Sequence, residues 1–156
     1  MSPFPGGPMF RPFSTQRRVE FRDTDTAGIA HFTAFFYYME AAEHECLRQL
    51  GLSVLMKDAD GQLTWPRVAA ACQYLSPARF EDLLTIDVYV SRLGAKSVTW
   101  TFEFRLDQRR IAQGTLTSVC CRLEESGPRS IEIPRWFRER LHPLLPPPCG
   151  AEIAQA

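Results

Sequence analysis

Apolar and polar residues follow two different periods along this chain, and the change of period separates the elements that it predicts. Val19 and Phe21 alternate with charged residues over residues 16–22, and this period of two predicts a first strand. From Phe32 to Leu50 the apolar residues recur at spacings of three, four and seven, which predicts a long helix with one apolar face. That face is expected to comprise Phe32, Phe35, Phe36, Met39, Ala42, Cys46, Leu47 and Leu50.

The other side of the predicted helix is polar. It carries Glu40, Glu43, His44 and Arg48, together with Tyr37 and Tyr38. Gly51 follows directly, as a glycine in the left-handed conformation commonly does at the end of a helix. We expect a partner subunit to cover part of this polar face in a dimer.

The second half of the chain predicts strands and one short terminal helix. The clearest alternation runs from Ser97 to Leu106, where Val98, Trp100 and Phe102 share a face and the residues between them occupy the other. The expected strands cover residues 64–75, 84–91, 97–106 and 111–123, with a polar turn at 107–110 and a helix at 133–141. Because no helices separate these strands, the sheet should be mostly antiparallel, and one long helix packed on one curved sheet is an α+β architecture.

Length and composition indicate a single globular domain. The chain has 156 residues, of which 45% are hydrophobic and 23% charged, and we expect one folded domain at residues 14–142. The Pro- and Gly-rich residues 1–13 and the Pro-rich tail 143–156 are expected to be flexible. Eighteen basic residues balance eighteen acidic ones, so no overall charge attracts the chain to nucleic acid or to an anionic membrane.

The cysteines and the apolar segments bear on compartment and cofactors. The five cysteines lack both the CxxC spacing and the histidine pairing of zinc sites. No apolar run is long enough to span a bilayer, and the N-terminus lacks the apolar segment of a secretory signal. We therefore expect a cytoplasmic protein with reduced thiols, without a metal, a cofactor or a membrane span.

One short segment, residues 23–40 (DTDTAGIAHFTAFFYYME), places a carboxylate, a glycine turn and a helix start together. A carboxylate beside the free N–H groups of a helix start can attack a carbonyl, and those groups can stabilise the oxyanion that forms. Asp25 precedes Gly28, which permits close backbone approach, and apolar neighbours leave such a carboxylate poorly solvated. The alternative is that Asp23 or Asp25 caps a turn by accepting backbone N–H bonds. The local sequence leaves both interpretations open.

The motif from Asp25 to Ile29 (DTAGI), the aromatic-rich helix FTAFFYYMEAAE and the pair Gly51–Leu52 resemble the 4-hydroxybenzoyl-CoA thioesterase family of hotdog-fold proteins. The bacterial acyl-CoA thioesterases of the Tol-Pal cluster belong to the same group. The resemblance extends from residue 16 to residue 141 and includes the segments FED at 80–82 and GAKS at 94–97. It implies a long central helix wrapped by a five-stranded antiparallel sheet, paired into homodimers or homotetramers. The motif marks the family well and the substrate poorly.

The resemblance also implies roles for particular residues. The family's catalytic aspartate is the second of its DxD motif, here Asp25, and it acts on a thioester carbonyl as nucleophile or as general base for water. The carbonyl oxygen is received by a backbone N–H at the helix start, near Phe32. Several acyl-CoA thioesterases of this family have Tyr-His where this chain has His31 and Phe32. His31 is therefore expected either to orient water or the thioester, or to be a solvated residue of the helix start.

CoA needs positive charge for its phosphates. Arg92, Lys96 and Ser97 bracket Gly94 at a strand turn, where the family places part of its pantetheine and nucleotide contacts, and Gly28 allows close approach of the substrate. An exposed basic loop without a ligand is the alternative. The C-terminal segment forms a second candidate patch, made of Arg129, Arg135, Arg138 and Arg140.

We therefore expect a thioesterase that hydrolyses an acyl-CoA, aroyl-CoA or acyl-carrier thioester to a free acid and a thiol, with Asp25 as the carboxylate. The first alternative is a non-catalytic hotdog protein that binds acyl-CoA or acyl carrier protein, because ligand binding and catalysis use the same helix start. A hotdog dehydratase ranks third, since its motif of paired histidine and carboxylate is not recognisable in this sequence.

Overall fold

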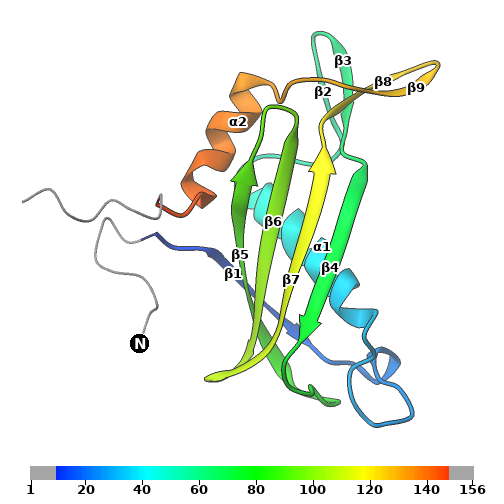
Figure 1. Ribbon diagram of the computed structural model, residues 1–156, viewed down its shortest axis with the longest axis vertical. Helices are drawn as coiled ribbons and strands as arrows, with labels where there is room; N and C mark the ends of the chain where they lie inside the picture. Colours follow the sequence, from blue (N-terminus) through cyan, green and yellow to red (C-terminus); the bar gives the residue numbers. More distant parts are fainter. Residues whose placement is uncertain (1–9, 148–156) are drawn as a thin grey trace, which may run out of the picture.

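Three long neighbouring strands with alternating buried side chains form the centre of the main sheet (Figure 1). The computed structural model describes residues 10–147, and every strand pair of this sheet is antiparallel. The strands lie in the order β1 (Phe13–Arg18), β5 (Leu83–Leu93), β6 (Ser97–Leu106), β7 (Arg109–Val119) and β4 (Arg67–Tyr74). β6 has the bounds that its alternation predicts, and the antiparallel α+β architecture is confirmed.

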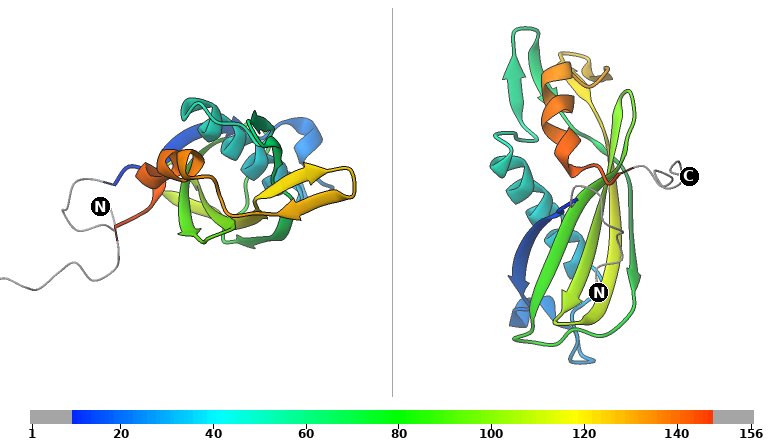
Figure 2. Two further views of the ribbon diagram at one scale, coloured as in Figure 1. Left: turned by 90° about the horizontal axis from the view of Figure 1, so that it is seen from above. Right: turned by 90° about the vertical axis from the view of Figure 1, so that its left-hand side faces the viewer.

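One face of this sheet carries the apolar core. Along β6, the side chains of Trp100, Phe102 and Phe104 are at most 3% exposed and share one face. Phe102 lies opposite Val88 of β5 on one side and opposite Gly114 of β7 on the other. The sheet is curved, and the long helix lies along its inner face (Figure 2). Burial of these side chains against the helix removes apolar area from water and so stabilises the fold.

The long helix α1 (Ala34–Gln49) ends at the predicted glycine. Gly51 has a φ of +68°, and its N–H donates to Arg48 O at 3.0 Å. The Leu52 N–H donates to Leu47 O at 2.8 Å, which completes a Schellman motif. The helix starts two positions later than the apolar pattern predicts, because residues 32 and 33 form a turn.

Three residues of the predicted helix differ in burial from the expectation. Phe32, expected on the apolar face, lies in the turn before α1 and is 58% exposed. Glu43 and Tyr38, expected on the polar side, are 2% and 6% exposed. The Glu43 carboxylate pairs with Arg67, and the Tyr38 hydroxyl donates to Asp23. Such partners lower the cost of burying a polar group, and helical periodicity alone does not reveal them.

The first strand begins and ends earlier than its alternation predicts. β1 spans Phe13–Arg18 rather than residues 16–22, and the chain then turns into the 3₁₀-helix η1 (Phe21–Asp23). Val19 is fully buried, but its N–H donates to Asp82 O at 2.8 Å, outside the ladder between β1 and β5. The alternation therefore continues past the point at which the backbone leaves the sheet.

A second, smaller sheet lies beyond one end of the first and was not predicted. It contains β2 (Met56–Asp58), β3 (Gly61–Thr64), β8 (Cys121–Glu124) and β9 (Gly127–Ser130), in that order. The single strands expected at residues 64–75 and 111–123 are each interrupted, and the interruptions pass the chain from one sheet to the other. Arg122 joins the two hairpins, because its guanidinium donates to the Asp58 carboxylate at 2.6 Å and to Gly61 O at 2.8 Å.

The C-terminal helix α2 (Arg135–Leu141) packs over the same end of the main sheet and leads into the 3₁₀-helix η2 (His142–Leu144) (Figure 1). Its Phe137 ring lies against the Trp65 ring, with the centroids 4.7 Å apart. α2 starts two residues later than the helix predicted at 133–141, after a proline that holds an extended conformation.

Two terminal segments fall outside the described residues. Residues 1–9 and 148–156 include most of the ends that we expect to be flexible, and that expectation stays a prediction. Within residues 10–147, no helix is long and apolar enough to cross a membrane.

Candidate active site

The loop between η1 and α1 holds Asp25 in a compact turn at the lower end of the molecule in Figure 1. The Asp25 N–H donates to Ile29 O at 3.0 Å, and the Gly28 N–H donates to Asp25 O at 3.0 Å. Gly28 has a φ of +75°, which glycine adopts without steric cost. The Ala30 N–H donates to Ala78 O at 2.7 Å and ties the loop to the segment before β5. Hydrogen bonds within the loop therefore close the turn, and one bond to the segment before β5 fixes its position.

The two aspartates of the DxD motif have different hydrogen-bond partners. Asp23 Oδ2 accepts both the Tyr38 hydroxyl at 2.7 Å and the Glu20 N–H at 2.9 Å. Asp25 Oδ1 accepts the Ala27 N–H at 2.8 Å, while no hydrogen bond within residues 10–147 involves Asp25 Oδ2. Both aspartates therefore cap turns, and each keeps one carboxylate oxygen, Oδ1 of Asp23 and Oδ2 of Asp25, that makes no hydrogen bond within the described residues.

A backbone donor lies unpaired where α1 begins. The Phe32 N–H donates to no hydrogen bond within the described residues, whereas the preceding His31 N–H donates to Asp23 O at 2.7 Å. Thr33, which precedes α1, makes no side-chain cap. The unpaired N–H and the positive end of the helix dipole can together stabilise a negatively charged oxygen. This is the position at which the family resemblance implies the oxyanion donor.

His31 lies beside this donor and is half-buried. Its ring packs against the Phe32 ring, with the centroids 4.5 Å apart. His31 Nδ1 accepts the Thr33 N–H at 3.3 Å and contacts Thr33 Oγ1 at 2.7 Å. A neutral imidazole whose Nδ1 accepts carries its proton on Nε2, so one N–H of the ring remains for a ligand.

The residues predicted to contact CoA lie at the opposite end of the main sheet. Arg92, Lys96 and Ser97 surround the turn between β5 and β6, at the upper end in Figure 1. The Gly94 N–H closes this turn by donating to Ser97 O at 2.8 Å. β5 has 11 residues, which separates its ends by roughly 33 Å at the usual rise of a strand. Within one chain, the structure therefore does not bring these residues together with Asp25.

The second predicted basic patch makes contacts within the chain. Arg138 donates to Gly94 O at 2.6 Å, and Arg140 donates to Gly51 O at 3.0 Å. The other two arginines pair with glutamates close in sequence. Two of the four guanidinium groups thus hold α2 against the rest of the molecule.

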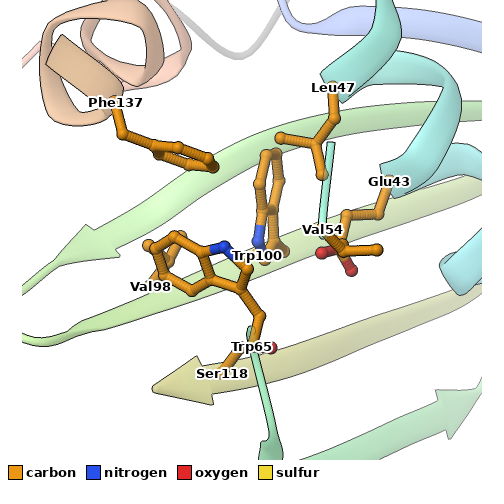
Figure 3. A pocket seen from close by; sticks show the side chains of 8 residues that line it. All are labelled: Glu43, Leu47, Val54, Trp65, Val98, Trp100, Ser118 and Phe137. Atoms are coloured by element: carbon orange, nitrogen blue, oxygen red, sulfur yellow. The ribbon is translucent and has the colours of Figure 1, made fainter. Parts of the chain in front are cut away.

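A second polar cluster lies in the core, beside the C-terminal half of α1 (Figure 3). Burial raises the pKa of the Glu43 carboxyl to about 7, although the paired Arg67 guanidinium acts to lower it. The carboxylate borders a small cavity lined also by Trp65, Trp100 and Phe137. Trp65 Nε1 has no acceptor within the described residues. The sequence contains no signal for this cluster, because Glu43 has the spacing of an exposed helical carboxylate.

The described residues contain no group of three or more His, Cys, Asp or Glu side chains that could hold a metal ion. His44, one helical turn after Glu40, belongs to no such group, and burial lowers the pKa of its imidazole.

Comparison with known proteins gives a family for these features. The sequence profile of the Thioesterase superfamily matches residues 27–113, more than half of the chain. A 1,4-dihydroxy-2-naphthoyl-CoA hydrolase of Synechococcus sp. is 29% identical over 136 residues, covering 80% of this chain and 88% of its own. The acyl-CoA thioesterase YbgC of Haemophilus influenzae is 28% identical over 134 residues, covering 85% of this chain and 96% of its own.

The three-dimensional structure agrees with that match. The crystal structure of a 1,4-dihydroxy-2-naphthoyl-CoA thioesterase from Synechocystis is similar with a TM-score of 0.73, over 83% of this chain and 95% of that one. Its sequence is 22% identical, so this likeness concerns the fold alone. The chain therefore belongs to the Thioesterase superfamily, and the predictions of a hotdog fold and of a thioester hydrolase are confirmed.

Proposed function

We propose that this protein is an acyl-CoA or aroyl-CoA thioesterase in which Asp25 supplies the reacting carboxylate and the Phe32 N–H receives the carbonyl oxygen. One observation carries the proposal. Within residues 10–147, the same loop holds a carboxylate oxygen without a hydrogen bond and an unpaired backbone donor at a helix start. The two relatives are named for an aromatic CoA thioester and for acyl-CoA, which supports CoA thioesters as the substrate class.

The chemistry requires one carboxylate and an oxyanion donor. As a general base, Asp25 takes a proton from water, and the resulting hydroxide adds to the thioester carbonyl carbon. As a nucleophile, Asp25 adds to that carbon itself and forms a mixed anhydride, which water then hydrolyses. In both routes the Phe32 N–H stabilises the negative oxygen of the tetrahedral intermediate. The C–S bond breaks, the CoA thiolate takes up a proton, and a free acid remains.

The position of the predicted CoA contacts supports a site that two subunits share. β4 is an edge strand of the main sheet, so a second copy can pair with it antiparallel about a twofold axis. Such pairing places the upper end of one copy beside the lower end of the other. The turn that carries Arg92, Lys96 and Ser97 then lies at the same end as the partner's Asp25 loop. We propose a homodimer on this basis.

The thiols support a location in a reducing compartment. Cys46, Cys72, Cys120 and Cys121, the cysteines of the described residues, are all free. Because disulfides persist mainly in oxidising compartments, we propose that the protein is cytoplasmic.

Asp25→Asn tests the proposed role of the carboxylate. The amide oxygen can still accept the Ala27 N–H, so the turn should keep its geometry. We expect kcat for thiol release to fall roughly 10²- to 10⁴-fold. The assay uses short-chain, long-chain and aromatic CoA thioesters, and oligomeric mass and thermal stability should stay unchanged.

Asp60→Asn is the matched control, because Asp60 lies in the exposed turn between β2 and β3. It should retain full activity. Normal turnover by Asp25→Asn would contradict the assignment of Asp25 as the reacting carboxylate. Saturable binding of CoA thioesters by the unaltered protein, without thiol release, would instead favour a non-catalytic binding protein.

A further inference from the structure

Two tyrosine hydroxyls donate hydrogen bonds to residues of the candidate site. The first tyrosine belongs to α1. Tyr38 is 6% exposed, and its hydroxyl donates to Asp23 Oδ2 at 2.7 Å. Asp23 also accepts the Glu20 N–H through Oδ2 at 2.9 Å and the His31 N–H through its carbonyl at 2.7 Å. These bonds connect the helix to the segments on both sides of Asp25.

The second hydroxyl belongs to Tyr74, the last residue of β4. It donates to Phe32 O at 2.9 Å, and the Tyr74 ring packs against the Phe35 ring with the centroids 5.4 Å apart. Phe32 O stands outside the helical ladder, because the Phe36 N–H donates to Thr33 O at 3.1 Å instead. Tyr74 therefore fixes the residue whose N–H is the proposed oxyanion donor, and it leaves that N–H unpaired.

Both hydroxyls are weak acids in these surroundings. Burial, and then the hydrogen bond and charge of Asp23, raise the pKa of Tyr38 far above its ordinary value. Burial raises the pKa of Tyr74 to about 12, with a smaller contribution from Cys72. Each hydroxyl thus keeps its proton at neutral pH and serves as a hydrogen-bond donor rather than as an acid or base of the reaction.

We propose that Tyr38 and Tyr74 are positioning residues for thioester hydrolysis: Tyr38 positions the Asp25 carboxylate, and Tyr74 positions the Phe32 N–H. The inference rests on the proposed function. Both tyrosines act through groups that they hold, so they influence the geometry of the reacting atoms and not the area that binds substrate. Displacing a catalytic group by about 1 Å can slow a reaction by about 10²-fold. Loss of either hydroxyl should therefore slow the chemical step more than it weakens binding.

Tyr38→Phe and Tyr74→Phe test this, because each keeps the aromatic ring and removes only the hydroxyl. We expect each variant to lower kcat for thiol release roughly ten- to hundredfold. KM should change less than about twofold, and so should the dissociation constant of a thioether analogue of an accepted CoA substrate, which cannot be hydrolysed. All rates are measured well below the melting temperature of each variant.

Tyr37→Phe is the matched control. Tyr37 neighbours Tyr38 on α1, is 73% exposed, and makes no hydrogen bond within the described residues through its hydroxyl. This variant should keep the kcat of the unaltered protein. A control that loses as much activity as Tyr38→Phe would overturn the assignment of Tyr38.

Two further outcomes contradict the proposal and leave the proposed function intact. In one, both Phe variants match the kcat of the unaltered protein. In the other, weaker binding of the thioether analogue accounts for the whole loss of activity, which makes the tyrosines structural. Failure of the proposed function gives a different result: the unaltered protein then releases no thiol from any substrate. In that case the positioning role is contradicted as well.

Discussion

Hydrogen-bond partners distinguish residues that look equivalent in the sequence. Asp23 and Asp25 share a DxD motif, yet Asp23 accepts the Tyr38 hydroxyl and a backbone N–H through the same oxygen. Asp25 Oδ1 accepts a backbone N–H of the turn, and within residues 10–147 no donor contacts Asp25 Oδ2. Asp23 Oδ1, like Asp25 Oδ2, makes no hydrogen bond within these residues, but Asp23 Oδ2 accepts two hydrogen bonds. The hydrogen bonds therefore give Asp23 a structural role between η1 and α1, while Asp25, whose carboxylate makes a single hydrogen bond within the described residues, is the aspartate that we propose for chemistry.

Glu43 provides a prediction at the scale of a single residue. Burial raises the pKa of its carboxyl from 4.5 to about 7. As the pH rises through this interval, the folded protein keeps a proton that the unfolded chain releases, so the free energy of unfolding falls. Relative to Glu43→Gln, the unaltered protein should lose stability between about pH 4.5 and about pH 7, then change little. Urea unfolding over that interval measures the difference.

Glu40→Gln controls for the shared arginine. Glu40 is exposed and lies 3.8 Å from Arg67, the partner of Glu43. This variant should largely keep the pH dependence of the unaltered protein. A pH dependence that is identical in the unaltered protein and Glu43→Gln would show that Glu43 does not titrate in this range.

At the scale of elements, the contact between α1 and β7 depends on one position without a side chain. Gly114 of β7 lies opposite Phe102 of β6, and the fully buried Met39 of α1 packs over it. A Cβ at position 114 would overlap Met39 Sδ and approach Ala71 O at 3.2 Å. This glycine therefore sets how closely the helix approaches the sheet, and with it the position of the helix start.

Gly114→Ala should lower the free energy of unfolding by about 1–3 kcal/mol, the usual cost of overpacking a core. Since the overlap is mainly with Met39, the same substitution should cost much less in a Met39→Ala background. A double-mutant cycle by urea denaturation measures the coupling. Equal costs in the two backgrounds would mean that the contact between Gly114 and Met39 is not the cause.

At the scale of the whole molecule, β4 presents an unusual edge. Its residues Ala69, Ala70 and Ala71 are exposed, and so are Val68 at 61% and Tyr74 at 47%. Residues 68–74 of this edge carry no charge, and an edge with unpaired backbone groups and no charge is a template for pairing with another strand. The distance of Asp25 from the predicted CoA contacts is consistent with such pairing, because a single chain holds the two groups at opposite ends of the main sheet.

We expect light scattering to show a homodimer of the 17.8 kDa chain. Val68→Lys adds a charge at the exposed edge and should shift the protein toward monomer and lower its activity, while its thermal unfolding remains cooperative. Val68→Ala, which adds no charge, serves as the control and should stay dimeric. A fully active monomer would refute the shared site.

Much of the fold could be predicted because it depends on short-range properties of the chain. The alternation of Ser97–Leu106 is strict since each residue faces either the core or the other side, and Gly51 ends α1 through its own conformational freedom. The second sheet was missed for the opposite reason. It depends on Arg122 reaching Asp58, 64 positions away, and periodicity carries no information about such a pair.

The sequence by itself determined the antiparallel α+β architecture, the helix end, and the turn that holds Asp25 ahead of the helix, because period, glycine and motif are local properties. Only the tertiary structure decided which polar groups are hydrogen-bonded or ion-paired and which are left without a partner within the described residues. Tyr74 and Phe32 are 42 residues apart, yet one hydrogen bond joins them. Glu43 has the spacing of an exposed residue, but Arg67 on another element compensates its burial. Burial and hydrogen-bond partners come from distant parts of the chain, so they are set only when the chain folds.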